Sequence, residues 1–216
     1  MEQLTLFSGL EEYQKPKNDD KLLSKISGLL YIPEYITKNE HDELWNSVNS
    51  ETWLGDLKRR VQHYGYKYDY KARFIDYSMK IGNLPEWASK LAEKLYADRY
   101  MQAKPDQLIV NEYKQGQGIA NHIDCEPCFG DTIISLSLGS TCIMDFINKK
   151  TKESIEVLLE PRSLVVLKAN ARYLWTHGIK GKKFDIFNGQ KIERNTRISL
   201  TFRNVIINSC PFKQKN

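Results

Sequence analysis

The stretch TIISLSLGS, residues 132–140, alternates between apolar residues and serine along its centre. Side chains on a β-strand point alternately to opposite faces, so this pattern predicts a strand with one apolar face and one face lined by hydroxyl groups. Six further short runs after residue 107 are alternating or rich in β-branched residues: LIVNEY, CIMDF, SIEVLLE, SLVVLKA, RYLWTHGI and RISLTFRNVII. Seven such runs in about a hundred residues, separated by turn residues, predict an antiparallel sandwich or barrel.

Helical periodicity dominates the chain ahead of these strands. GLLYIP, residues 28–33, predicts a strand that its proline ends. TKNEHDELWNSV, residues 37–48, has the Thr37 and Glu40 spacing of a capping box that opens a helix. LPEWASKLAEKLYADRYM, residues 84–101, repeats apolar residues at steps of three and four and predicts a second amphipathic helix. The expected fold is therefore α+β and mainly β: a double-stranded β-helix, or jelly roll, with N-terminal helices packed against its sheet.

The chain has 216 residues, 41% of them hydrophobic, which is enough to bury the core of one domain. We expect this domain to span residues 28–208, after a flexible polar leader of residues 1–27 and before a tail of residues 209–216. No apolar run is long enough to span a bilayer, and the N-terminus lacks the basic start and apolar region of a secretory signal. We therefore expect an intracellular, cytoplasmic monomer that makes no membrane contact.

The net charge of +5 favours an anionic partner such as nucleic acid. The four cysteines, Cys125, Cys128, Cys142 and Cys210, are interpreted as reduced thiols because a chain without a secretory signal is expected in a reducing compartment. The spacing of Cys125 and Cys128 also suits zinc or redox chemistry. Zinc needs about four ligands, however, and no second Cys or His pair has matching spacing.

Three residues form a candidate metal site. His122 and Asp124 lie two residues apart in a strand-like segment, so their side chains project to the same side. His177 lies far along the chain, but facing strands of a jelly roll bring such positions together. Two histidines and one carboxylate that leave other positions open form the facial triad of non-haem Fe(II) oxygenases. Each residue alone is more often an ordinary surface or core residue, whereas the three together predict iron.

The run RISLTFR suggests where a co-substrate binds. An iron site of this kind binds O2 and a two-electron co-substrate, and a dicarboxylate co-substrate requires fixed cations such as arginine, whose planar fork pairs a carboxylate through two hydrogen bonds. One face of the extended run is fully apolar, and the other carries Arg197, Ser199, Thr201 and Arg203. A solvated outer face is the alternative for these four residues. Upstream, Asn111 and Tyr113 also share a face and could donate hydrogen bonds to the same acid.

Taken in order, Asn111-x-Tyr113, His122-x-Asp124, His177 and Arg197-x5-Arg203 resemble the AlkB family of Fe(II)- and 2-oxoglutarate-dependent dioxygenases, from about residue 28 to residue 205. RRVQHYGY, RYLWTHGI and SLTFR are most similar to the AlkB-like domain of tRNA wobble-uridine hydroxylases. The resemblance implies that His122, Asp124 and His177 bind Fe(II). It also implies contacts to 2-oxoglutarate from Arg197, at the distal carboxylate, from Asn111, Tyr113 and Ser199, and from Arg203, which would lie beside the iron-proximal end of the co-substrate in the catalytic centre.

The resemblance also indicates substrate contacts. In this family a flipped base enters a pocket roofed by a variable segment ahead of the sheet, and residues 57–73, LKRRVQHYGYKYDYKAR, occupy that place. Aromatic faces can stack bases while cations meet phosphates. The candidate contacts are Arg59, Arg60, Tyr64, Tyr66 and Tyr68, together with Glu126, at a position that touches the base in relatives. A tyrosine-rich edge hairpin packed on its own domain is the alternative interpretation of residues 57–73.

The function implied by the resemblance is oxidative demethylation of alkylated bases in DNA or RNA, with Fe(II), 2-oxoglutarate and O2. One alternative is hydroxylation of a tRNA wobble-base side chain. Another is a nucleic-acid-binding jelly-roll protein that has lost catalysis or holds a different metal. The complete set of ligands and arginines argues against the loss of catalysis.

The N-terminal run QLTLF, Gln3 to Phe7, has the spacing of peptides that dock bacterial DNA-processing proteins onto the sliding clamp. Two leucines and a phenylalanine could fill an apolar groove while Gln3 forms a hydrogen bond at its rim, and the polar leader would act as a tether. The alternative is that these apolar side chains pack back onto the domain. The clamp hypothesis presumes a bacterial host and a DNA substrate.

Overall fold

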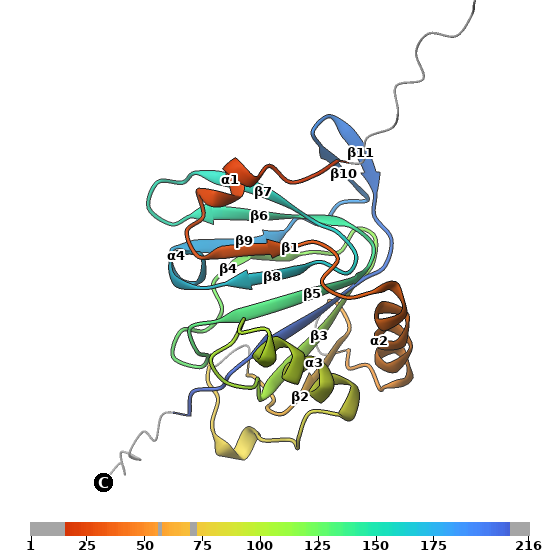
Figure 1. Cartoon of the computed structure of the whole chain (residues 1–216), viewed down its shortest axis with the longest axis vertical. Coiled ribbons are helices and arrows are strands. Elements are labelled where there is room, and N and C mark those ends of the chain that lie inside the picture. The colour runs from red at the N-terminus through yellow and green to blue at the C-terminus, as the bar shows by residue number, and fades with distance from the viewer. Residues whose placement is uncertain (1–15, 56–57, 70–72, 208–216) are drawn as a thin grey trace, which may run out of the picture.

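Two antiparallel sheets form the body of the protein in the computed structural model, which describes residues 16–55, 58–69 and 73–207 (Figure 1). The larger sheet has the strand order β1 (Leu29–Ile32), β8 (Leu164–Leu167), β5 (Ile133–Gly139), β12 (Arg197–Arg203), β3 (Gln107–Tyr113) and β2 (Val61–Tyr64). The smaller sheet has the order β4 (Ile119–His122), β9 (Trp175–Ile179), β6 (Cys142–Asn148) and β7 (Ser154–Leu159). A separate hairpin pairs β10 (Phe184–Phe187) with β11 (Gln190–Glu193). This arrangement confirms the predicted jelly roll.

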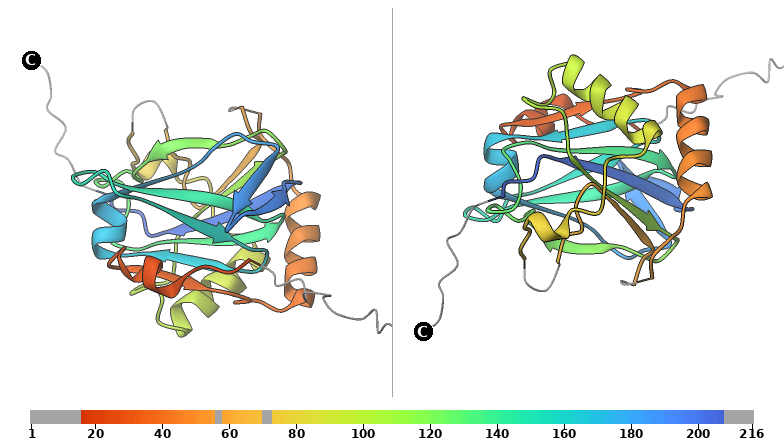
Figure 2. Two further views of the ribbon diagram at one scale, coloured as in Figure 1. Left: turned by 90° about the horizontal axis from the view of Figure 1, so that it is seen from above. Right: turned by 90° about the horizontal axis from the view of Figure 1, so that it is seen from below.

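Side-chain alternation divides the protein into layers. The apolar face of β5, with Ile134, Leu136 and Leu138, packs in a cluster with α2 (Lys38–Ser50) and α3 (Glu86–Ala97). Figure 2 shows these two helices on the outer face of the larger sheet. The opposite face of β5, which bears Ser135 and Ser137, turns toward the smaller sheet. The alternating stretch therefore places a polar surface inside the sandwich.

The predicted start of α2 is confirmed in atomic detail. The Thr37 hydroxyl accepts a hydrogen bond from the Glu40 amide at 3.2 Å, and the Glu40 carboxylate accepts one from the Thr37 amide at 2.7 Å. This reciprocal pair satisfies two backbone donors that a helix start otherwise leaves unpaired. The predicted second helix is also present as α3, which begins after Pro85.

Residues 16–27, which we expected in the flexible leader, pack on the domain instead. The Asn18 side chain accepts a hydrogen bond from the Leu158 amide at 2.8 Å and donates one to the Leu158 carbonyl at 2.9 Å. Strand β7, which carries Leu158, is an edge of the smaller sheet, and an edge leaves backbone groups unpaired. The short helix α1 (Asp20–Ser24) follows, and Ile26 is buried in the core. The ordered domain therefore begins before residue 28, while Gln3 to Phe7 lie outside the described residues.

Other elements also differ from the sequence-based expectation. RYLWTHGI is not one strand: the helix α4 (Ala169–Tyr173) contains its first residues, and β9 begins only at Trp175. The Leu174 amide donates to the Asn170 carbonyl at 2.8 Å, which closes a helical turn where aromatic and branched residues suggested a strand. Residues 57–73 contain β2, and a short 3-10 helix, η1 (Tyr77–Met79), follows them.

The described helices are short. The longest, α2, has 13 residues, whereas a membrane-spanning helix needs about 20. In the part of the chain that the structure describes, no helix is long and apolar enough to cross a membrane.

The capping box gives a test of the fold. Replacing Thr37 by alanine should lower the free energy of unfolding by about 1 kcal/mol, because the Glu40 amide loses its acceptor at the helix start. Ser47→Ala on the same helix is the matched control, since the Ser47 hydroxyl only donates to the Glu43 carbonyl within the helix. Chemical denaturation of both variants measures the difference. Equal stabilities would show that the capping box contributes nothing.

Candidate active site

The three predicted metal ligands meet at one end of the smaller sheet. Strands β4 and β9 pair in a register that sets His122 opposite His177, and their ring centroids lie 4.5 Å apart. Asp124 follows β4 by two residues, and its Oδ2 atom lies 3.4 Å from His177 Nε2. One ligand atom from each of the three residues falls within 4.8 Å of the other two, a separation at which a single ion can bind all three. Register and spacing together therefore create the site.

The protonation states of these residues suit a divalent cation. Burial, reinforced by the neighbouring His122, lowers the pKa of His177 to about 3, so this ring is neutral at physiological pH. Burial also raises the pKa of Asp124, but Arg203 and the two histidines outweigh it and hold the pKa below its usual value. Nδ1 of His122 contacts the Ala120 carbonyl at 2.9 Å, which leaves Nε2 as the free lone pair. The site therefore offers a neutral imidazole from His177, the Nε2 atom of His122 and one carboxylate.

Arginine side chains from β12 line the same cavity. Arg197 donates to the Ser137 hydroxyl at 2.9 Å, and Arg203 pairs with Asp124 Oδ1 while its Nη1 contacts Gln107 Oε1 at 3.4 Å. The cavity also receives Ser199 and Thr201. Arg197 and Arg203 are only 2% and 8% exposed, so the alternative of a solvated outer face is wrong.

Asn111 and Tyr113 face the arginines across a strand pair. Strands β3 and β12 pair so that Asn111 lies opposite Ser199 and Tyr113 opposite Arg197. The Arg197 guanidinium lies 5.7 Å from the centre of the Tyr113 ring. Burial raises the pKa of Tyr113, so its hydroxyl stays protonated and can donate a hydrogen bond. The structure thus brings all the residues predicted to bind the metal and the co-substrate into one cavity.

Buried polar atoms without partners mark what this cavity accommodates. Among the described residues, the buried atoms without a hydrogen-bond partner include Asp124 Oδ2, Arg197 Nε and Arg197 Nη1. Each such atom costs about 1–3 kcal/mol unless a bound group satisfies it. Asp124 Oδ2 beside two imidazoles fits a metal ion, and the unpaired donors of the Arg197 guanidinium fit a carboxylate. The residues present therefore fit Fe(II) and a dicarboxylate.

Comparison with known proteins agrees with this geometry. The family model described as the 2OG-Fe(II) oxygenase superfamily matches residues 15–203. The chain belongs to this superfamily. Within it, the chain is a dioxygenase of the AlkB family, since its curated relatives include proteins named as AlkB homologues.

Two curated relatives and one solved structure illustrate the relationship. The mouse protein named tRNA (carboxymethyluridine(34)-5-O)-methyltransferase ALKBH8 is 41% identical over 82% of this chain, which spans 30% of that protein. The Arabidopsis thaliana protein named alkylated DNA repair protein ALKBH8 homolog is 36% identical over 87% of this chain, which spans 61% of that protein. The structure of OsALKBH1 shares 16% identity with a TM-score of 0.63 and covers 89% of this chain and 99% of its own, which supports the double-stranded β-helix fold.

The residues predicted to contact an AlkB-type substrate are placed less uniformly. Tyr66 and Tyr68 are 7% and 9% exposed and belong to the core between the sheets. Tyr64 packs edge-on against Trp87 of α3, with 5.6 Å between ring centres. The three side chains come from the edge strand β2 and the residues that follow it, and all three pack within the domain. This packing favours the alternative interpretation of residues 57–73, a tyrosine-rich edge hairpin that packs on its own domain. Glu126 is exposed in the loop after β4 and does not line the cavity.

The two arginines of that segment point to opposite sides. Arg60 donates to both Glu112 oxygens, at 2.7 and 2.5 Å, and lies 4.8 Å from the centre of the Trp53 ring. Arg59 lines the cavity and donates to Asn111 Oδ1 at 2.9 Å. Both arginines therefore form contacts within the domain, although Arg60 remains exposed.

The prediction that Cys125 and Cys128 are reduced thiols is wrong in this structure, because the two form a disulfide. The loop turns back on itself here, since the Cys128 and Phe129 amides both donate to the Cys125 carbonyl, at 3.3 and 3.2 Å. Their Cα atoms are therefore only 5.2 Å apart, a separation that a disulfide spans. Cys142 is a free, buried cysteine, as expected.

Arg172 is a functional residue that the sequence analysis missed. Its side chain is 2% exposed and donates to the carbonyl groups of Asp124 at 2.9 Å and Cys125 at 3.3 Å, with longer contacts to those of Phe129 and Gly130. Helix α4 thus fixes the loop that carries the carboxylate ligand. The sequence signal for this role was the position of Arg172, five residues before the candidate ligand His177. Because a strand was expected there instead of helix α4, the direction of the Arg172 side chain could not be predicted.

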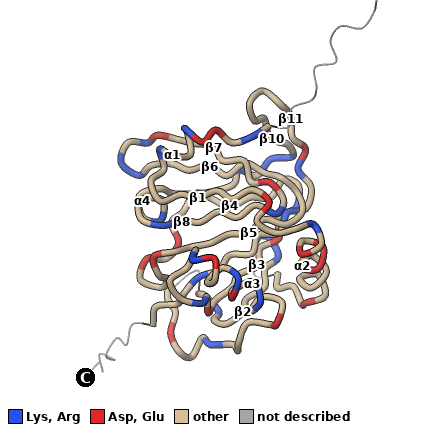
Figure 3. Tube along the Cα trace, in the orientation of Figure 1, with Lys and Arg blue, Asp and Glu red and all other residues tan. Residues whose placement is uncertain are grey.

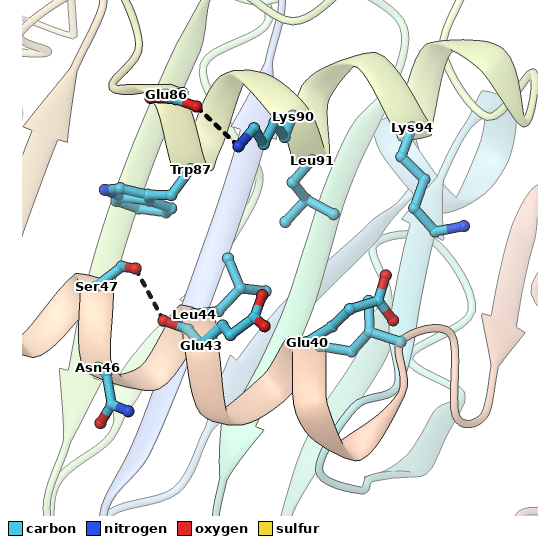
Figure 4. Close-up of a pocket in the computed structure, with 11 residues that line it drawn as sticks. Glu40, Glu43, Leu44, Asn46, Ser47, Glu86, Trp87, Lys90, Leu91 and Lys94 are labelled. Atoms are coloured by element: carbon cyan, nitrogen blue, oxygen red, sulfur yellow. Dashed lines mark hydrogen bonds and ion pairs between the residues drawn. The ribbon is translucent and has the colours of Figure 1, made fainter.

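A larger groove lies elsewhere, between α2 and α3 (Figure 4). Among its polar groups, Lys90 contacts Glu86 at 2.7 Å, and Ser47 donates to the Glu43 carbonyl. Its apolar floor includes Leu44 and Leu91, which pack on the outer face of the larger sheet. The groove and the metal ligands are therefore on opposite sides of that sheet, and we assign the chemistry to the cavity.

The buried charges predict different outcomes for two ligand variants. Asp124 also pairs with the buried Arg203. Asp124→Ala should therefore abolish metal binding and also lower the stability of the metal-free protein by about 3–5 kcal/mol, because a buried charge loses its partner. His177→Ala should abolish metal binding with a smaller loss, since its ring is neutral.

Calorimetry with Mn(II) and denaturation of the metal-free proteins measure the two effects separately. Full metal binding by either variant would disprove the ligand assignment. Equal stabilities of the two variants would show that the Arg203 pair does not stabilise the fold.

Proposed function

We propose that this dioxygenase uses Fe(II), 2-oxoglutarate and O2 to demethylate alkylated bases in DNA or RNA by oxidation. The observation that carries the proposal is the pair of unpartnered Arg197 nitrogens in the cavity that also holds His122, Asp124 and His177. A metal site alone would fit many chemistries. A metal site beside a buried arginine that has no carboxylate partner among the described residues fits the co-substrate of this superfamily.

Different residues of the cavity would bind the co-substrate and the metal. Arg197 binds the distal carboxylate of 2-oxoglutarate, with the Tyr113 hydroxyl as a second donor. Arg203 keeps Asp124 ionised, so that this carboxylate binds a cation rather than a proton. Iron bound there supplies the oxidation that inserts one oxygen atom of O2 into a carbon–hydrogen bond while 2-oxoglutarate becomes succinate and carbon dioxide. A hydroxylated N-methyl group then releases formaldehyde and leaves the unmodified base.

Hydroxylation of a tRNA wobble-base side chain is the second candidate. It is favoured by the 41% identity to the mouse relative, whose name specifies a uridine at position 34 of tRNA. Both candidates begin with hydroxylation of a carbon attached to a base, so the same cavity serves either. The products differ, because only an N-methyl substrate releases formaldehyde.

Surface charge contributes little to the choice of substrate. Figure 3 shows Lys and Arg interspersed with Asp and Glu along much of the described trace. The net charge of +5 is compatible with a polyanion but does not single out DNA or RNA. We also propose, from the sequence alone, that Gln3 to Phe7 dock to a sliding clamp. The same holds for the proposals that the enzyme is monomeric and that it is cytoplasmic.

The co-substrate assignment has a direct test. Purified protein with Fe(II) should convert 2-oxoglutarate into succinate, and Arg197→Ala should weaken 2-oxoglutarate binding by about 2–5 kcal/mol, because the carboxylate loses its buried partner. Arg162→Ala is the control, since Arg162 forms an ion pair with Glu34 and does not line the cavity. An unchanged Michaelis constant for 2-oxoglutarate in Arg197→Ala would exclude Arg197 from the co-substrate site.

A substrate panel separates the two candidate functions. N-methylated DNA and RNA oligonucleotides should yield formaldehyde together with succinate if demethylation is the reaction. Succinate formation with a wobble-modified tRNA and without formaldehyde would instead establish hydroxylation of the uridine side chain. Succinate formation that no nucleic acid stimulates would contradict both.

A further inference from the structure

Arg59 contacts the co-substrate side of the cavity rather than an outer surface. Its Nε donates to Asn111 Oδ1 at 2.9 Å, and its guanidinium lies 5.5 Å from the centre of the Tyr113 ring. Arg197 lies 5.7 Å from the centre of the same ring. Arg59 therefore belongs to the group of residues that surrounds the predicted 2-oxoglutarate site, although it comes from the segment before β2.

The contact with Asn111 fixes the direction of an amide. An asparagine side chain has an accepting end, Oδ1, and a donating end, Nδ2, and only its partners decide which end faces a ligand. Arg59 occupies Oδ1 here, whereas Nδ2 donates no hydrogen bond to any described residue. A carboxylate only accepts hydrogen bonds, so it requires the donating end. The Arg59 contact thus prepares Asn111 for an anionic ligand.

The neighbouring arginine is an internal comparison. Successive residues of an extended segment point to opposite sides, and Arg60 accordingly pairs with Glu112 and stacks over Trp53, away from the cavity. The two arginines are adjacent in sequence and equal in charge, but only Arg59 lines the cavity. An effect that depends on overall positive charge would involve both, whereas an effect on the cavity would involve Arg59 alone.

We infer that Arg59 is a positioning residue of the co-substrate site, which holds the Asn111 amide with Nδ2 directed at a carboxylate of 2-oxoglutarate. This inference rests on the proposed function, because it requires that 2-oxoglutarate binds in the cavity. It also reassigns Arg59 from the predicted nucleic-acid contact to the co-substrate.

The test is a double-mutant cycle on 2-oxoglutarate binding. Calorimetric titration of 2-oxoglutarate into Mn(II)-loaded protein measures affinity without turnover, for wild type, Arg59→Met, Asn111→Ala and the double variant. Arg59→Met should weaken binding about tenfold, the usual scale for one charge-assisted hydrogen bond. The double variant should bind no more weakly than Asn111→Ala alone, since the two residues act through one contact. Arg60→Met should bind as wild type does.

A kinetic readout separates positioning from a general loss of structure. Arg59→Met should raise the Michaelis constant for 2-oxoglutarate while kcat at saturating 2-oxoglutarate and the affinity for Mn(II) stay close to those of wild type. A variant that was merely misfolded would lose kcat and metal binding as well, and that result would overturn the positioning role.

Other outcomes also decide the question. Equal 2-oxoglutarate affinities of wild type and Arg59→Met would overturn the inference while leaving the proposed function intact, and so would additive losses in the cycle. Weaker oligonucleotide binding by Arg59→Met, with unchanged 2-oxoglutarate affinity, would return Arg59 to the nucleic-acid interface. Failure of Mn(II)-loaded wild type to bind 2-oxoglutarate would overturn the proposed function itself, and the inference with it.

Discussion

Apolar and polar side chains alternate along β12, and the rest of the structure depends on this alternation. Ile198, Leu200 and Phe202 are fully buried against the helices, so the hydrophobic effect fixes which face of the strand turns outward. A slip of one residue would exchange the two faces and is excluded by this burial. The same constraint forces Arg197 and Arg203 into the interior, where they need anionic partners. Packing on one side of the strand thus determines the chemistry on the other.

The charged side chains inside the cavity are mostly positive. Asp124 is a single carboxylate that faces Arg203, Arg172 and two histidines, and all four contribute to holding its pKa down. The cavity therefore contains more buried positive charge than negative charge. A bound dicarboxylate would compensate this excess positive charge. Under the proposed function, the metal and the co-substrate would therefore share the same set of buried charges, although different residues would contact each of them.

The sequence predicted the cluster of candidate ligands and the arginine face, because both rest on local patterns of period two and the expected jelly roll brings His177 to His122 and Asp124. It did not predict the role of Arg172, whose contacts are carbonyl groups of a distant loop and leave no signature in composition. Tyr66 and Tyr68 were expected at a substrate surface because tyrosine and arginine interleave there, but burial depends on tertiary packing that the pattern does not contain. The disulfide was missed for a related reason, since the inferred cell compartment argued for reduced thiols while the turn at Cys125 brings the sulfur atoms together.

Asn18 has a consequence for how the protein tolerates shortening. Its side chain occupies the backbone amide and carbonyl of Leu158 on the outer strand of the smaller sheet. Without the segment before residue 28, these groups would be open to pairing with the strand of another molecule, which is the usual route from an unprotected β edge to aggregation. The Asn18 side chain therefore protects this part of the outer strand from pairing with a second molecule.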